Sequence, residues 1–490
     1  MDSASLITRL AGLFDAQINT PAWLVGGAVR DALLGREVQD IDLAVTGDAQ
    51  PVGHAVAEHL GATAVPLPEW NIVRVALPGL AENVRPFLID ISGFGGTIED
   101  DLRSRDFTVD AMGIPIACWD SDERFDAIID PLSGRADLAR RVLRAGSDGV
   151  FDADPGRMLR AVRLAQQVGL RMEPDTARLI RRDARLLHRV SPERVRDEFM
   201  AILAADGARP QLEVLDRLDL LCRVIPELEA AKHCQQPRSH HYWDVWGHLL
   251  HCVEYAEEVT AGHRNNAIYT MAPWTAKGDS YFAEIIGDGH TRRTVLKLAA
   301  LLHDIAKPQT RAADADGRVR FLGHSEQGSE IVQRRLSSLR LSRRITDLVS
   351  EMVLHHLRPS QLRHGSAMPS PRAIFRYYRD VGDASVDTLY LAMADVLAAR
   401  GPDLAPERWA NYARMVAAVL EAGAEQPGNR NGNPPLINGH DLMDSLDLPP
   451  GPRIGSLLER LREAEAVGEI SSREDAMELA ARLVNQGDQS

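Results

Sequence analysis

Two aspartates separated by one residue, Asp40 and Asp42, lie in the apolar run DIDLAV and offer the clearest chemistry in the chain. Alternate residues of a β-strand point to the same face, so a strand here would place both carboxylates side by side. Carboxylates that close repel each other unless a cation neutralises them, and their oxygens suit Mg²⁺. Asp90, in the strand-like run FLIDIS, is our candidate for a third carboxylate, with Asp106 as the competitor. Alone, the acidic pair could also be a solvated loop.

A glycine pair, Gly26-Gly27, ends the run LVGG just upstream. Without side chains, its backbone N–H groups can approach phosphate oxygens. We expect a helix over 28–34, stopped by Gly35, whose positive N-terminal end favours an anion and whose first turn carries Arg30. A glycine pair by itself could be a plain tight turn. The order strand, turn, helix and acidic strand instead favours nucleotidyl transfer, in which two metals about 3.5–4 Å apart polarise a hydroxyl and stabilise the leaving pyrophosphate.

A second group of metal-ligand residues surrounds the adjacent pair His303-Asp304, in an apolar helix that we expect Pro308 to close. A histidine nitrogen and an aspartate oxygen can converge on one metal. Further residues of ligand type stand in chain order at His248, His324, His355 (in the pair His355-His356) and Asp395. A single buried histidine is more often a satisfied core residue, but the ordered set favours a metal site. There Lys307 or an arginine would hold a phosphate.

The bulk composition is that of a globular protein with several domains. The 490 residues exceed a single core, and the 44% hydrophobic and 26% charged content is ordinary. No apolar run reaches the roughly 18–20 residues needed to span a bilayer, and no secretory signal is evident at the N-terminus. The four cysteines stand far apart, which fits a reducing compartment. We therefore expect a cytoplasmic protein with no membrane segment.

The formal net charge of −14 argues against nucleic-acid binding, but the charge is uneven. Between Arg135 and Arg196 there are about fifteen arginines and about eight acidic residues. This basic middle is compatible with RNA held at one place, although arginines on solvated helix faces would give the same count.

The elements that position these residues change character along the chain. An amphipathic helix over 1–22 precedes short β-type runs up to about 145 (LVGG, DIDLAV, NIVRVAL, FLIDIS, FTVDAMGIPI and FDAIID), alternating with one or two helices. Helical periodicity follows from 152 onward. The stretch 262–289 has no clear periodicity and predicts an insertion or a mobile loop. We expect an α+β head with a mixed sheet and flanking helices, followed by all-α parts, with boundaries at 1–146 (head), 147–210 (neck), 211–424 (body) and 425–490 (linker and tail).

The run GGAVRDALLGR, followed by D-x-D, resembles the head of the class II tRNA nucleotidyltransferases and bacterial poly(A) polymerases. Four more elements of that family follow in order, and the resemblance covers nearly all of 24–203. They are SRDFTVDA (104–111), DPLSGRADL (130–138), ADPGR (153–157) and SPER (191–194). The resemblance implies a nucleotidyltransferase head with a helical neck, Mg²⁺ as cofactor, and tRNA, CTP and ATP as partners.

The resemblance also implies roles for the matching residues. Asp40 and Asp42 would bind the catalytic metals. The triphosphate would be held by Gly26, Gly27 and Arg30, the sugar by Arg105 and Asp106, and the base edge by Asp154 and Arg157. A carboxylate and a guanidinium on the base edge would favour the amine-bearing bases C and A. Arg160 and Arg163, three and six residues further along the same side of the helix, are candidates for phosphate contacts.

The ordered set H…HD…D resembles the HD phosphohydrolase superfamily, with extra histidines that can hold a second metal. The resemblance implies hydrolysis of phosphoesters such as 2′,3′-cyclic phosphates, with Ni²⁺, Mn²⁺, Co²⁺ or Fe²⁺ as the metal. In the body and tail we therefore expect an HD domain followed by helices packed against it.

The chain departs from the family pattern at four positions. Asp110 replaces an Asn, Ala153 a Glu, Ser133 a Gly and Ser104 an Arg. The first two lie near the expected nucleotide pocket, so complete CCA addition, A-only addition and CC-only addition all stay open. A poly(A) polymerase is a further alternative, although the chain lacks a G-R-R-F element. An HD phosphohydrolase with a lapsed transferase head is the alternative from another class.

Overall fold

The computed structural model describes residues 3–38, 40–77, 87–239, 241–261, 270–274, 277–362, 368–425 and 436–487. The chain forms two compact units, Met1–Glu198 with Val214–Arg223 and Phe199–Glu213 with Val224–Ser490. Most of the expected linker at 425–435 lies outside the described residues. No helix in the described part of the chain is long and apolar enough to cross a bilayer.

The first unit contains a six-stranded sheet with the order β3-β4-β5-β2-β1-β6. Its strands are β1 (Ala22–Val25), β2 (Ile41–Thr46), β3 (Thr63–Leu67), β4 (Ile72–Ala76), β5 (Leu88–Phe94) and β6 (Gly113–Pro115). Strands β2 and β5 pair in parallel, and the other neighbours pair antiparallel. The predicted mixed sheet is therefore confirmed.

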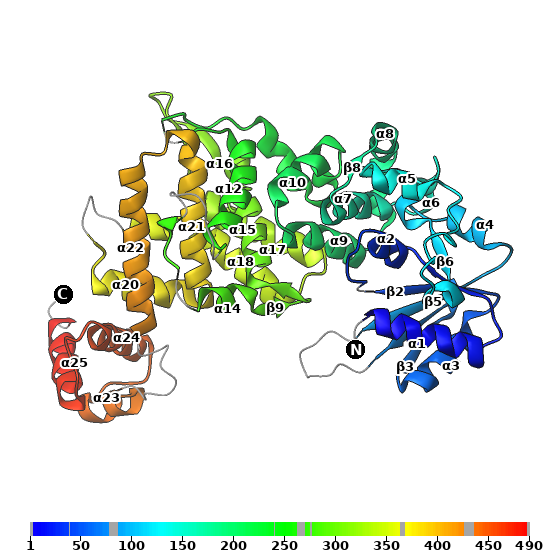
Figure 1. Cartoon of the computed structure of the whole chain (residues 1–490). Helices are drawn as coiled ribbons and strands as arrows, with labels where there is room; N and C mark the ends of the chain where they lie inside the picture. Colours follow the sequence, from blue (N-terminus) through cyan, green and yellow to red (C-terminus); the bar gives the residue numbers. More distant parts are fainter. Residues whose placement is uncertain are drawn as a thin grey trace. The chain divides into compact units, whose positions relative to one another are not determined.

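Helices flank this sheet, as predicted. They are α1 (Ser3–Ala16), α2 (Gly27–Leu33), α3 (Ala49–Leu60), α4 (Ile98–Arg103) and α5 (Gly134–Ala139). Helix α3 packs so closely on Val73 of β4 that a Cβ at Gly53 would lie 2.5 Å from the valine side chain. Because side chains alternate along a strand, Arg74 points to the opposite face. In Figure 1, α2 and α3 lie on opposite sides of the sheet.

The strand predictions in the head were wrong at three places. Strand β3 was not expected, while FTVDAMGIPI contributes only the short β6 after a 3₁₀ turn at Thr108–Asp110. Thr108 N donates to Arg144 O, and the Thr108 hydroxyl donates to Asp137, so this turn is hydrogen-bonded outside the sheet. The run FDAIID provides a single bridge, from Ile129 to Gly113.

The neck is helical, as predicted, apart from one small parallel strand pair, β7 (Val142–Leu143) with β8 (Arg171–Met172). Its helices are α6 (Val150–Ala153), α7 (Arg157–Val168), α8 (Pro174–Asp183), a 3₁₀ turn at Ala184–Arg189, and α9 (Pro192–Ala204). Helix α7 buries an apolar face that includes Met158, Leu159 and Val162, and it ends at Gly169 with φ +73°. The opposite face of α7 carries its arginines.

The second unit is mostly helical, with α12 packed against both α15 and α21 (Figure 1). Its helices include α12 (Val245–Val259), α15 (Arg292–Leu302), α16 (Lys307–Thr310), α17 (His324–Ser338), α18 (Arg343–His355), α19 (Arg358–Gln361), α20 (Pro371–Val381), α21 (Ser385–Arg400) and α22 (Pro406–Glu425). Helices α10 (Ala208–Arg217) and α11 (Leu221–Val224) precede them, and Val214–Arg223 of this region belong to the first unit. Strands β11 (Arg311–Ala313) and β12 (Val319–Phe321) form a hairpin between α16 and α17.

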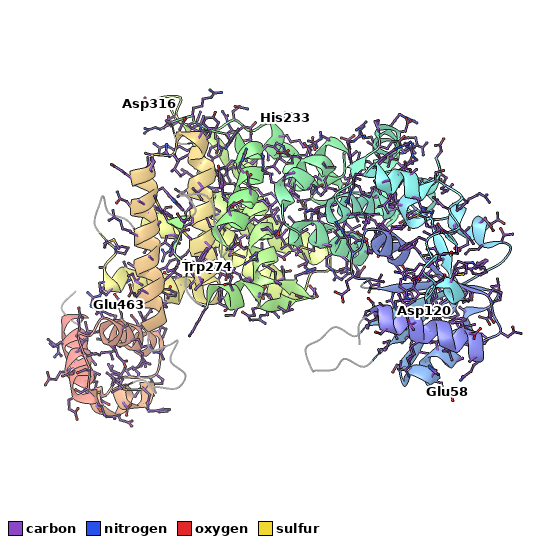
Figure 2. All side chains as sticks on the ribbon, in the orientation of Figure 1. Glu58, Asp120, His233, Trp274, Asp316 and Glu463 are labelled. Atoms are coloured by element: carbon purple, nitrogen blue, oxygen red, sulfur yellow. The ribbon has the colours of Figure 1, made fainter. Side chains whose placement is uncertain are left out.

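The stretch predicted to lack regular structure, 262–289, contains helix α14 (Gly278–Ala283) and strand β9 (Ile285–Gly287). Strand β9 pairs with β10 (His290–Thr291). Trp274, labelled in Figure 2, stacks on Phe282 with ring centroids 5.7 Å apart. The described part of this stretch is therefore packed, which the prediction missed; residues 262–269 and 275–276 lie outside the described residues.

The tail forms three helices, α23 (Gly439–Leu446), α24 (Pro452–Ala466) and α25 (Arg473–Gly487), around an apolar cluster of their own. Glu463 of α24, labelled in Figure 2, forms ion pairs with Arg372 and Arg376 of α20, both at 2.8 Å. The tail thus contacts the body, as expected.

Candidate catalytic and metal sites

Asp42 and Asp90 are direct neighbours in the parallel pair of β2 and β5, so their side chains lie on the same face of the sheet. Arg74, opposite Asp90 on β4, donates to both Asp90 carboxylate oxygens at 2.8 and 2.7 Å. Sequence reasoning missed Arg74, although the alternation in NIVRVAL places it on the polar face of its strand.

Asp40 lies in a bend just before β2 and is exposed, so only Asp42 is within the strand. The prediction that both aspartates belong to one strand was therefore wrong for Asp40, which lies one residue before β2 begins. The charges of Asp90, Asp40 and Asp42 nevertheless act together, because all three raise the pKa of Arg74. The structure therefore brings the three predicted carboxylates into one neighbourhood.

Asp42 carries a charge that its surroundings do not fully compensate. Its pKa is raised from 3.8 to about 6, mainly because burial disfavours the ionised form; Arg105 opposes this shift, and the charge of Asp90 adds to it. A carboxylate in this position is stabilised in its ionised form by a cation. The donor set of carboxylate oxygens fits Mg²⁺.

The glycine turn passes directly beside Asp42. Gly26 has φ +69°, and a Cβ built there would lie 3.2 Å from both Asp42 Oδ2 and Arg105 Nη1. A larger residue would therefore be strained and crowded. The turn places backbone against the acidic group, as the sequence predicted.

Arg30, predicted to hold the triphosphate, pairs with two carboxylates in the structure. It is buried, and its guanidinium donates to Asp110 Oδ1 at 2.5 Å and to both oxygens of Asp31 at 3.0 Å. Two carboxylates therefore occupy the guanidinium that was expected to hold a triphosphate. One of these two carboxylates is that of Asp110.

Asp106 is paired with Arg160 of α7, with Arg160 Nε 2.7 Å from Asp106 Oδ2. Arg160 Nη2 also lies 3.7 Å from Asp110 Oδ2. Asp106 is thus tied to the neck, and Asp90 is the third carboxylate beside Asp42. Arg105 itself pairs with Asp101 at 3.1 Å.

On the neck, Asp154 receives two hydrogen bonds from Arg194, at 2.8 and 2.7 Å, and lies 3.5 Å from Arg157 Nε. Burial opposes the ionisation of Asp154, but Arg194 outweighs it and keeps the pKa below 3.8. The elements ADPGR and SPER are thereby joined. Arg163, a predicted phosphate contact, donates instead to both oxygens of Glu198 at 2.6 and 3.3 Å.

The second group of ligand-type residues forms a buried cluster from five segments of the chain, three of them helices and two of them turns that follow a helix. His248 Nε2 lies 3.1 Å from His303 Nε2, 3.1 Å from Asp395 Oδ1 and 3.4 Å from Asp304 Oδ2. On the other side of Asp304, Oδ1 lies 3.3 Å from His324 Nε2 and 3.7 Å from His356 Nε2. Each carboxylate oxygen of Asp304 therefore faces one pair of histidines. Oδ2 faces His248 and His303, and Oδ1 faces His324 and His356.

Three of these histidines are oriented by backbone carbonyls. The Nδ1 atoms of His303, His324 and His356 lie 2.9, 2.6 and 2.7 Å from carbonyls three residues earlier. A donating Nδ1–H leaves Nε2 as a lone-pair ligand, the arrangement found around protein-bound metals. Asp304 Oδ1 is buried and accepts no hydrogen bond among the described residues. These donors fit one or two divalent transition metals, with Asp304 between them.

His355, which we predicted as a ligand, lies outside this cluster and pairs with Glu351 at 3.3 Å. Its neighbour His356 is buried in the cluster, and burial lowers its pKa to about 4, so it is neutral and able to ligate. The predicted helix is also shorter than expected. Helix α15 ends at Leu302, His303 and Asp304 follow in a turn, and Pro308 lies in the first turn of α16, which begins at Lys307.

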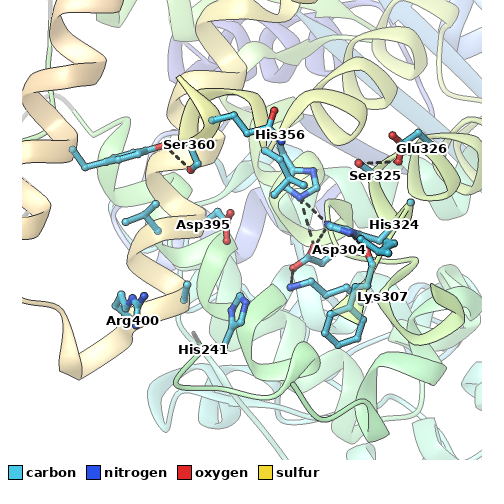
Figure 3. A pocket seen from close by; sticks show the side chains of 18 of the residues that line it. His241, Asp304, Lys307, His324, Ser325, Glu326, His356, Ser360, Asp395 and Arg400 are labelled. Atoms are coloured by element: carbon cyan, nitrogen blue, oxygen red, sulfur yellow. Dashed lines mark hydrogen bonds and ion pairs between the residues drawn. The ribbon is translucent and has the colours of Figure 1, made fainter. Parts of the chain in front are cut away.

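A cavity of about 1020 Å³ opens beside the cluster (Figure 3). Asp304, His324, His356 and Asp395 line it together with Lys307. Lys307 Nζ lies 2.6 Å from Asp304 Oδ2. Solvent and a substrate can therefore reach the ligand atoms from one side.

Comparisons with known proteins match both the head and the body of the chain. Sequence models match residues 22–144 ("Poly A polymerase head domain"), 169–232 ("Probable RNA and SrmB- binding site of polymerase A") and 245–400 ("HD domain"). The A-adding tRNA nucleotidyltransferase of Deinococcus radiodurans is 33% identical, over 95% of this chain and 96% of that protein. The chain therefore belongs to the tRNA nucleotidyltransferase and poly(A) polymerase family.

Other members of the family extend the comparison. The CC-adding tRNA nucleotidyltransferase of Thermus thermophilus is 30% identical, over 93% of this chain and 92% of that protein. The solved structure of the Thermotoga maritima CCA-adding enzyme complexed with tRNA has a TM-score of 0.60 at 21% identity, and the match covers 99% of both chains. This structural likeness confirms the family fold along the chain.

Proposed function

We propose that the protein adds nucleotides from CTP and ATP to the 3′ end of tRNA without a nucleic-acid template. The observation that carries this proposal is the pairing of Asp42 with Asp90 on one sheet face, directly beside the Gly26-Gly27 turn. The names of the full-length relatives, and the tRNA complexed with the Thermotoga maritima enzyme, support the substrate class.

In this proposal Asp40, Asp42 and Asp90 hold two Mg²⁺ ions. Mg²⁺ held by these carboxylates would polarise the attacking 3′-hydroxyl and neutralise charge on the leaving pyrophosphate. Gly26 and Gly27 offer backbone N–H groups to the triphosphate, and Arg105 lies next to that turn. Asp154 and Arg157 hydrogen-bond the base edge, and the two bonds from Arg194 keep Asp154 ionised and in place.

The proposed functional parts are the head (1–146), the neck (147–210), the body with its HD domain (211–424) and the linker and tail (425–490). In the body, the cluster around Asp304 holds the metal and hydrolyses phosphoesters, which the cavity beside it admits. Lys307, next to Asp304, contacts the substrate phosphate.

A partial activity is the second candidate. The relatives named above, which align along nearly the whole chain, are named A-adding and CC-adding. Asp110, where the family pattern has Asn, binds Arg30 and faces Arg160 close to the expected nucleotide site. These observations support partial addition as a candidate beside complete addition of the CCA end.

The decisive experiment uses tRNAs that end before the first C, before the second C or before the terminal A, each with CTP, ATP or both. Product lengths distinguish complete, CC-only and A-only addition and repeated tailing. The Asp42→Ala variant should add nothing yet keep phosphoesterase activity, and Asp304→Ala should show the reverse. Incorporation by Asp42→Ala at the wild-type rate would refute the proposed transfer site.

A further inference from the structure

Two arginines line the same cavity as the HD cluster. Arg400 is the last residue of α21, and Arg408 lies in the first turn of α22. Among the described residues, no carboxylate forms an ion pair with either guanidinium, and Arg400 Nη1 donates to the carbonyl of Ser239 at 3.2 Å. Burial and then the charge of Arg408 lower the pKa of Arg400, so the two cations lie close enough to repel each other.

One side of helix α21 carries both Arg400 and the candidate metal ligand Asp395. Asp395, Val396, Ala399 and Arg400 all line the cavity, at helical spacings that share a side. Arg400 is five residues beyond Asp395, which corresponds to a rise of about 7.5 Å along the helix. The cavity therefore has imidazoles and carboxylates at one end and guanidiniums at the other; Figure 3 shows Arg400 and Asp395 among its lining side chains.

We propose that Arg400 and Arg408 form a second phosphate subsite, so that the cavity takes an RNA 3′ end rather than a lone mononucleotide. The terminal phosphate lies at the Asp304 cluster, and the preceding phosphodiester lies on the two arginines. This inference rests on the proposed hydrolysis and names its substrate class. In the reaction, the oxygen of water forms a bond to the terminal phosphorus, one ester P–O bond breaks, and the released ribose oxygen takes a proton. The diester on the arginines is unchanged.

Charge and size both support this subsite. Two like charges in one concave site are unfavourable until an anion joins them. Guanidinium groups present paired N–H donors that match phosphate oxygens. The cavity volume of about 1020 Å³ also lies at the top of the roughly 300–1,000 Å³ range of ligand pockets, larger than one phosphate group requires.

The first test compares two substrates of the full-length protein, adenosine 2′,3′-cyclic phosphate and the dinucleotide CpA ending in a 2′,3′-cyclic phosphate. We expect kcat/KM of the wild type to be at least about tenfold higher for the dinucleotide, the value of one charged hydrogen bond. Arg400→Ala and Arg408→Ala should each lose most of this preference, with the mononucleotide rate within about twofold of wild type. The matched control is Arg414→Ala; Arg414 is on the same helix as Arg408 and is exposed like it, but it is bonded to Asn411 and is not among the residues that line the cavity.

The second test measures binding without turnover, by calorimetry in EDTA with 3′-phosphorylated CpA and with 3′-AMP. Arg400→Ala should weaken the dinucleotide about tenfold and leave 3′-AMP unchanged. Equal affinities of wild type and Arg400→Ala for the dinucleotide would overturn the subsite, even if both proteins hydrolyse cyclic phosphates. If the wild type binds the dinucleotide more tightly than Arg400→Ala does but hydrolyses neither cyclic phosphate, the proposed hydrolysis would be refuted and the subsite upheld.

Discussion

Replacing Asp42 by Asn should stabilise the metal-free protein at pH 8 while abolishing nucleotide addition. Burial next to Asp90 raises the pKa of Asp42 to about 6, so keeping this carboxylate ionised destabilises the folded protein. Asn has nearly the same shape and no charge, so the substitution removes that penalty. A functional residue is thus expected to be a source of instability.

The magnitude and sign follow from proton linkage. A carboxyl group whose pKa is higher in the folded state binds its proton more tightly there, so stability falls as the pH rises from 3.8 to about 6. Above pH 6 the loss is complete. At 1.36 kcal/mol per pH unit, the interval corresponds to about 3 kcal/mol. At pH 5 the pH has risen through only about half of the interval between the unfolded and folded pKa values, so the loss of folding stability is about 1.5 kcal/mol.

Urea unfolding in EDTA at pH 8 and pH 5, followed by tryptophan fluorescence, measures this difference. Trp23 of β1 packs on Phe94, with ring centroids 5.7 Å apart, and reports on the head. The control is Asp40→Asn, which removes an exposed charge and should change the free energy of unfolding by less than about 0.5 kcal/mol. Mg²⁺ at pH 8 should stabilise the wild type and narrow its gap to Asp42→Asn.

Two outcomes would refute this reasoning. One is a stabilisation by Asp42→Asn of less than about 1 kcal/mol at pH 8, which would mean that the buried, ionised Asp42 does not lower the free energy of unfolding. The other is an equal stabilisation at pH 5 and pH 8, which would assign the effect to packing rather than to charge.

Three further predictions concern other parts of the two sites. His356→Ala should lower the metal content of the purified protein, measured by mass spectrometry of the metals, whereas His355→Ala should leave it unchanged; equal losses would contradict the assignment of His356. Asp110→Asn should loosen the contacts to Arg30 and Arg160 and raise KM for the nucleotide about tenfold, the effect of losing one charged contact, with a smaller change in kcat; an unchanged KM would show that Asp110 is only structural. Arg157→Ala should reduce selection among the four nucleoside triphosphates, and selectivity equal to that of the wild type in competition assays would exclude contact with the base edge.

The missed strand β3 shows what sequence patterns cannot decide alone. Its run TAVPL contains Pro66, and a proline within a run argues against a central strand. In the structure β3 lies at the edge of the sheet, where one side of the backbone needs no partner. Strands β1, β2 and β5 were predictable because their apolar runs are buried within the sheet.

The arginines of the neck illustrate a second limit. Helical periodicity correctly places Arg160 and Arg163 on the side of α7 away from the buried Leu159 and Val162, where both arginines are half-buried. It gives no information about partners from other segments. Arg160 meets Asp106, and Arg163 meets Glu198, which lies 35 residues further along the chain. A positive charge on a predicted helix is therefore not yet a free phosphate contact, because only tertiary packing shows whether a carboxylate already holds it.

The wrong histidine, by contrast, was within reach of the sequence. Buried side chains of α18 include Val349, Met352 and Val353. A residue seven, four and three positions beyond these lies on the same face of the helix, and that residue is His356. His355 falls four residues after the exposed Glu351 and pairs with it. The spacing of the apolar residues therefore predicts that the His356 side chain enters the core. Because the other candidate metal ligands are buried, a further ligand must also lie on the core side of α18, which excludes His355.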